Sequence, residues 1–254
     1  MIPPESNRDS DRLKDIAFSL RSLVAEQPDD PELAQEALDF LALVAGLKPV
    51  FVAGRGSGVD GGWQAAIGAM ATAAGFVVRQ GPLWDATPWQ INARNIRVPD
   101  WYRNHCRTEL SGHRAIYVCR RGPDADDIDR INAAEGKLTI AEETRLLGYP
   151  DCCVAAHYDR ALRYHRATLS MLRRHAGGDE SRMLKLLEGH ANMAPVTEEE
   201  IDDLDAAFDI RPAPFGSWNL CTRCAGNADS PSAALSARYL DLAGKTELVP
   251  LLTG

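Results

Sequence analysis

A chain of 254 residues, 45% hydrophobic and 25% charged, is long enough to bury a sizeable core as one large domain or two small ones. Its net charge of -8, without a lysine- or arginine-rich tract, argues against binding to a nucleic-acid backbone. The longest apolar run, residues 65–78, is too short to cross a bilayer, and the N-terminus has no signal-peptide pattern. We therefore expect a cytoplasmic protein that binds neither nucleic acid nor membrane.

Two helices are predicted at the start of the chain. Apolar residues recur at helical spacing between about Asp11 and Glu26, and a second helix begins near Pro31 and ends at Gly46. We expect these helices to form an N-terminal hairpin, residues 1–47, that packs against the next segment of the chain.

An α/β segment is predicted for residues 48–122. A buried strand at 48–54 leads through a glycine-rich turn and a small-residue helix to a second strand at 75–81. This order predicts a βαβ-like unit, with a parallel strand pair and a right-handed crossover. The glycine-rich turn, residues 54–62, is either an anion-binding loop or a purely structural tight turn. A third strand is expected at 114–120.

Helices dominate the predicted C-terminal region, residues 123–254. They are expected after Thr139, from Pro150 to Gly177, and from Ser230 onward, with two shorter ones at 179–189 and 197–207. Together the elements predict a helix-rich α+β fold around a small, partly parallel sheet of three or four strands. The three segments form either separate domains or one compact domain.

Two adjacent cysteines come shortly after a proline in the string Gly-Tyr-Pro-Asp-Cys-Cys, residues 148–153. Neighbouring cysteines rarely bond to each other because the ring is strained, so they need other partners. With Pro150 at the first helical position, Cys152 and Cys153 lie in the first turn, where free N–H groups and the helix dipole favour thiolates. His157 lies on the same helix face, four residues after Cys153, where it could share a metal or a proton with it.

A second pair, Cys221 and Cys224, forms a Cys-x-x-Cys motif in the predicted loop 210–231. This spacing brings two sulfurs to one metal in zinc ribbons and in iron–sulfur proteins. In a reducing compartment, paired cysteines indicate metal binding or redox chemistry more than disulfides. We therefore predict that the two pairs meet around a metal. An iron–sulfur cluster is favoured over zinc, because adjacent cysteines suit several irons better than one tetrahedral ion.

Two other interpretations of the cysteines stay open. The Cys-x-x-Cys motif could be redox-active, although it lies in an irregular loop rather than between a strand and a helix. The cysteines could also be buried and unreactive, since free cysteine is among the most buried residue types. Cys106 and Cys119 are interpreted as core residues.

The string LLGYPDCCV (146–154), with the Cys-x-x-Cys motif and a serine-led helix downstream, resembles a prokaryotic family known only as domain of unknown function 483. The resemblance covers roughly the C-terminal half, from about Ile116 to Leu242. It implies that the four paired cysteines are shared with the family, and it implies no activity. The family is expected to carry an aromatic residue where His157 stands, so this histidine is either a ligand particular to this chain or a packing substitution.

These observations favour an enzyme with a cysteine-ligated iron–sulfur cluster, expected as 4Fe-4S, that acts on a small, amino-acid-like substrate. The predicted ligands are Cys152, Cys153, Cys221, Cys224 and His157, and no catalytic residue is assigned. The alternatives are a zinc-stabilised binding or accessory module and a thiol oxidoreductase. Whether the chain forms a homodimer is open.

Overall fold

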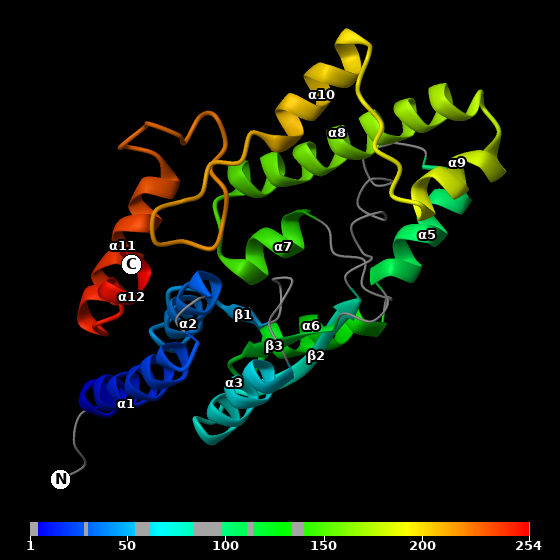
Figure 1. The fold of residues 1–254 in the computed structure, drawn as a ribbon. Helices are drawn as coiled ribbons and strands as arrows, with labels where there is room; N and C mark the ends of the chain where they lie inside the picture. Colours follow the sequence, from blue (N-terminus) through cyan, green and yellow to red (C-terminus); the bar gives the residue numbers. More distant parts are fainter. Residues whose placement is uncertain are drawn as a thin grey trace.

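The computed structural model describes residues 5–27, 30–53, 61–83, 98–110, 114–133 and 140–253 (Figure 1). The helices are α1 (Glu5–Ala25), α2 (Pro31–Val44), α3 (Gly61–Ala73), α5 (Asp100–Leu110), α6 (Pro123–Ala133), α7 (Ile140–Leu147), α8 (Asp151–Ala176), α9 (Glu180–Glu188), α10 (Glu198–Phe208), α11 (Pro231–Lys245) and α12 (Val249–Thr253). The strands are β1 (Val50–Ala53), β2 (Val77–Leu83) and β3 (Arg114–Cys119). The predicted helix-rich α+β fold with a small sheet is confirmed.

The sheet corrects one expectation. Its order in the described residues is β1-β3-β2, and both strand pairs are antiparallel, with Phe51 and Val78 each opposite Val118. β1 and β2 run in the same direction, as the βαβ-like order requires, but β3 lies between them and the expected parallel pair does not form. Val118 and Cys119 of β3 are fully buried, in keeping with a central strand that is hydrogen-bonded along both edges.

One apolar core joins the two ends of the chain. Leu20 of α1 and Phe40 of α2 pack in the same buried cluster as Tyr239 of α11 and the C-terminal Leu248. α11 and α12 both contact α2, and Figure 1 shows the C-terminal helices beside the N-terminal hairpin. This cluster also contains β-strand residues and three of the paired cysteines, so it includes parts of all three predicted segments. The domain boundaries at 47 and 122 stay a prediction.

The long helix α8 is held along its length by α10. Two buried carboxylates of α10, Asp203 and Glu200, pair with the guanidinium groups of Arg166 and Arg174 on α8. Glu200 also closes a capping box with Thr197 at the start of α10. These contacts fix the direction of α8, whose N-terminus carries the adjacent cysteines. None of the described helices is both long enough and apolar enough to cross a membrane.

Candidate metal centre

The four paired cysteines meet in space. The Sγ atoms of Cys152, Cys153, Cys221 and Cys224 all lie within 4.8 Å of one another. The sulfurs of Cys152 and Cys224 are 3.5 Å apart. Cys153, Cys221 and Cys224 are buried, and Cys152 is partly exposed. Such a set of four sulfurs, gathered from two distant parts of the sequence, is compatible with metal binding.

The first pair is placed by the junction between α7 and α8. Gly148 ends α7 in the left-handed conformation, with φ of 71°, and its N–H bonds to the Thr144 carbonyl at 2.9 Å. Pro150, two residues later, is extended and forms the N-cap of α8, whose first helical residue is Asp151. The prediction that Pro150 is the first helical residue is therefore wrong by one position. Cys152 and Cys153 still fall in the first turn of α8. Their sulfurs therefore lie near the positive end of the helix dipole, although the Cys153 N–H itself bonds to the Pro150 carbonyl at 2.8 Å.

The second pair lies in a folded loop. The segment before it doubles back, with an isolated β-bridge between Pro212 and Asn219. The Cys-x-x-Cys motif then makes a turn in which the Cys221 carbonyl accepts bonds from the N–H groups of Cys224 and Ala225, both at 3.0 Å. This turn brings Cys221 and Cys224 to the same side. The Cys221 N–H also points at the other pair, 3.4 Å from the sulfur of Cys153.

Ser232 and Trp218 support the centre and are not predicted from the sequence. The Ser232 hydroxyl lies 3.1 Å from the sulfur of Cys153. The indole Nε1 of Trp218 donates to the Ser232 oxygen at 3.2 Å. Because indole only donates, Ser232 accepts this bond, and its own proton is free to point at the sulfur. Ser232 lies in the first turn of α11, after the N-cap residue Ser230, so a second helix N-terminus faces the thiols.

The thiol pKa values show why a cation suits this cluster. Burial raises the pKa of Cys152 to about 12, with further contributions from hydrogen bonds to Cys224 and Cys221. Burial also raises the pKa of Cys153. The expectation that the helix start favours thiolates at these two positions is therefore wrong for the cluster without a cation, because burial outweighs the dipole. Burial acts in the same direction on Cys224, but hydrogen bonds from Ser232 and the neighbouring thiols outweigh it and lower that pKa to about 7. Sulfurs so close to one another cannot all become thiolates unless a positive charge lies among them.

A buried polar network adjoins the centre on the side of Tyr149. Asp39 accepts hydrogen bonds from Tyr239 at 2.8 Å and from Tyr149 at 3.3 Å, and it forms a buried ion pair with Lys48. The Lys48 ammonium also donates to the Tyr149 hydroxyl at 3.2 Å. The Tyr149 ring stacks on Trp218, with centroids 5.4 Å apart. The network thus connects α2 to the indole that holds Ser232.

The other candidate residues lie elsewhere. His157 is exposed, its ring contacts Tyr158, and it is not among the described residues whose ligand atoms converge. Cys119 lies in the sheet core, as interpreted, and burial raises its pKa to about 11. The side chain of Cys106 and residues 54–60 of the glycine-rich turn lie outside the described residues.

No protein-family model, no curated protein and no solved structure matches this chain at a significant level.

Proposed function

We propose that the four cysteines bind one metal ion, zinc, and that this ion joins the start of α8 to the 210–231 loop and the start of α11. The observation that carries the proposal is the convergence of four sulfurs within 4.8 Å of one another. Four thiolates fill a tetrahedral shell and leave no position for substrate, which is typical of a structural zinc site. The centre would then stabilise the C-terminal region.

The spacing of the sulfurs supports a single ion. Zinc–thiolate bonds of about 2.3 Å place the sulfurs of a tetrahedral site about 3.8 Å apart. The sulfurs of Cys152 and Cys224 are 3.5 Å apart, and no pair in the cluster exceeds 4.8 Å. Shifts of less than about 1 Å, within reach of a change in side-chain torsion, would complete the tetrahedron.

An iron–sulfur cluster is the second candidate. It is favoured by the adjacency of Cys152 and Cys153, which suits separate irons. If only three of the thiols bound, one iron would be open to a substrate. A 4Fe-4S cluster binds each thiolate through a different iron, so its sulfurs stand further apart than around one ion. All four sulfurs would have to move outward to admit it.

A thiol oxidoreductase receives less support. Cys152 and Cys224 are in contact, and the lowered pKa of Cys224 favours a thiolate. An attacking thiol also needs access to its substrate, and the Cys224 side chain is buried. The structure brings together four sulfurs rather than the two that such chemistry uses.

Metal analysis of protein purified without air tests the proposal. We expect a colourless protein with one zinc per chain, and loss of that zinc in Cys221→Ala. Cys119→Ala is the matched control, because it removes a buried thiol that lies outside the cluster. His157→Ala should also keep the metal, since its ring is exposed and apart from the converging sulfurs.

The other outcomes are distinct. A brown protein with an absorption band near 400 nm that bleaches on reduction would refute the zinc proposal in favour of the iron–sulfur cluster. Metal-free protein with a titratable disulfide would overturn both metal proposals in favour of the oxidoreductase. Full zinc loading in Cys221→Ala would refute the ligand set.

Several expectations from the sequence stay predictions. They are the relationship to domain of unknown function 483, the amino-acid-like substrate, the cytoplasmic location and the homodimer.

A further inference from the structure

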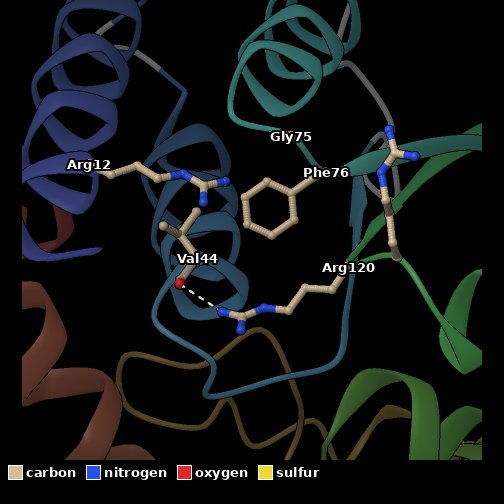
Figure 2. Close-up of a pocket in the computed structure, with 6 residues that line it drawn as sticks. Arg12, Val44, Gly75, Phe76 and Arg120 are labelled. Carbon is tan, nitrogen blue, oxygen red and sulfur yellow. Dashed lines mark hydrogen bonds between the residues drawn. The ribbon is translucent and has the colours of Figure 1, made fainter. Parts of the chain in front are cut away.

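Three arginines line a pocket near the N-terminal hairpin, apart from the cysteine cluster. The pocket has a volume of about 230 Å³ and is lined by Arg12, Val44, Gly75, Phe76, Arg120 and Arg121. Figure 2 shows the Arg12 guanidinium beside the Phe76 ring, while the Arg120 side chain reaches from the other side toward the Val44 carbonyl. The lining thus comes from α1, the end of α2, the α3–β2 turn and the residues after β3.

The three guanidinium groups have no acidic partner in the part of the chain that the structure describes. This is unusual for a protein of net charge -8, in which carboxylates outnumber the available cations. Arg12 is held by a cation–π contact, with its Cζ 4.7 Å from the Phe76 centroid. Its Nε is buried and has no hydrogen-bond partner among the described residues. A buried N–H without an acceptor is costly, so a ligand that accepts from it would be stabilised.

Two of the arginines, Arg12 and Arg120, donate hydrogen bonds to the C-terminal ends of helices. α2 and α3 both end beside the pocket in Schellman turns, with Gly46 and Gly75 at positive φ and their capping bonds in place. Arg120 donates to the carbonyl of Val44 at 3.0 Å, and Arg12 donates to the carbonyl of Ala74. A helix C-terminus carries about half a negative charge. Two such ends offset about one of the three guanidinium charges, and a net charge of about two remains.

We propose that this pocket binds a small oxyanion, either a phosphate group or a carboxylate, between the guanidinium groups of Arg12 and Arg120, with Arg121 adding positive charge to the lining. Guanidinium forks match the oxygens of both groups, and charge-assisted hydrogen bonds to them are the strong ones. The volume admits a small anion or one end of a larger ligand. The proposal is independent of the metal centre, because no cysteine of that cluster lines the pocket.

Titration calorimetry with inorganic phosphate, and separately with succinate, tests the proposal at constant ionic strength. Arg121→Gln is the informative variant, because Arg121 makes no hydrogen bond or ion pair and caps no helix within the described residues. Losing one positive charge from the lining should weaken binding several-fold, and the loss should shrink as the salt concentration rises. Arg182→Gln removes an exposed arginine of α9, a helix that lies far from α1 and α2 in Figure 1, and should leave the affinity unchanged.

A conservative variant separates charge from geometry. Arg12→Lys keeps the positive charge but loses the planar fork and Nε, so we expect weaker binding in this variant as well. Saturation by phosphate alone identifies a phosphate site, saturation by succinate alone identifies a carboxylate site, and saturation by both identifies a general oxyanion site. The proposal fails if neither anion saturates below about 20 mM, which is weaker than a specific site requires. It also fails if Arg121→Gln binds as tightly as the unchanged protein.

Discussion

Asp39→Asn tests the buried network beside the cysteine cluster. The side chains of Lys48 and Asp39 are 1% and 6% exposed, so the substitution leaves an ammonium without a carboxylate in the interior. Among the described residues, the Tyr149 hydroxyl, 3.2 Å away, and the Tyr149 ring remain near it, together with the new amide. Breaking a buried pair on one side costs about 3–5 kcal/mol. That is a large share of the roughly 5–15 kcal/mol by which a domain is stable.

The pH dependence gives this prediction a second readout. In the unchanged protein burial lowers the pKa of Lys48, but the charge and hydrogen bond of Asp39 outweigh it and raise that pKa. The pair therefore stabilises the fold below the unfolded pKa of lysine, near 10.4, and its contribution is lost as the pH rises through the folded value. In Asp39→Asn burial dominates, so the folded pKa of Lys48 falls below the unfolded one. The unfolded state then binds more protons, and stability rises with pH.

Urea unfolding monitored by circular dichroism at pH 6, 8 and 9.5 measures both effects. We expect a loss of about 3–5 kcal/mol at pH 6 that shrinks toward pH 9.5. Asp241→Asn is the control, because its pair with Lys245 is solvent-exposed and is worth less than about 1 kcal/mol. A loss below about 1 kcal/mol in Asp39→Asn, with a pH profile parallel to that of the unchanged protein, would refute the reasoning.

Two further predictions concern the support of the thiols. Ser232→Ala removes the hydroxyl that contacts Cys153 and should weaken zinc affinity about tenfold or more, measured by competition with a chelator. Ser236→Ala, one turn along the same helix, is its control, because the Ser236 oxygen has no partner among the described residues; equal affinities in both variants would contradict the role of Ser232. Gly216→Ala places a Cβ 2.1 Å from the Trp218 ring, so we expect the indole to shift, with lower zinc loading and a lower melting temperature. Gly244→Ala is the control, because its added Cβ meets no atom within 4 Å, and it should raise the melting temperature slightly. Unchanged zinc loading in Gly216→Ala would contradict the prediction and show that the indole can move freely.

Local signals in the sequence are sufficient to predict most of the helices. Gly46 predicts the end of α2 because the left-handed turn there, with φ of 74°, is a conformation that glycine adopts without strain. α6 is not predicted, although Pro123 at its first position and Asp124 and Asp126 in its first turn are typical of a helix start. Its few apolar residues give too weak a periodicity to be recognised.

Pairings between distant segments are harder to predict. The meeting of two cysteine pairs can be inferred, because their spacing and the helix start at Pro150 both indicate a shared ligand. The insertion of β3 between β1 and β2 cannot be inferred from the sequence, because short apolar strands carry no local signal that identifies their neighbours in the sheet. Ser232 and Trp218 escape prediction for the same reason. A serine in the first turn of a helix is ordinary, and only the fold shows that its hydroxyl faces Cys153.

The contacts around the cysteines would extend the effect of a bound metal beyond its ligands. Cys153 touches Ser232, Ser232 accepts from Trp218, and Trp218 stacks on Tyr149, which bonds to Asp39 of α2. Binding free energies of structural zinc reach about 10–16 kcal/mol, as large as the whole stability of many domains. The sheet and the contact of α8 with α9 have apolar clusters of their own, so these regions would depend less on a bound metal. The region that would depend on a metal most is the 210–231 loop, because it contributes few buried apolar side chains of its own. In contrast, α11 packs in the main apolar core with the N-terminal hairpin.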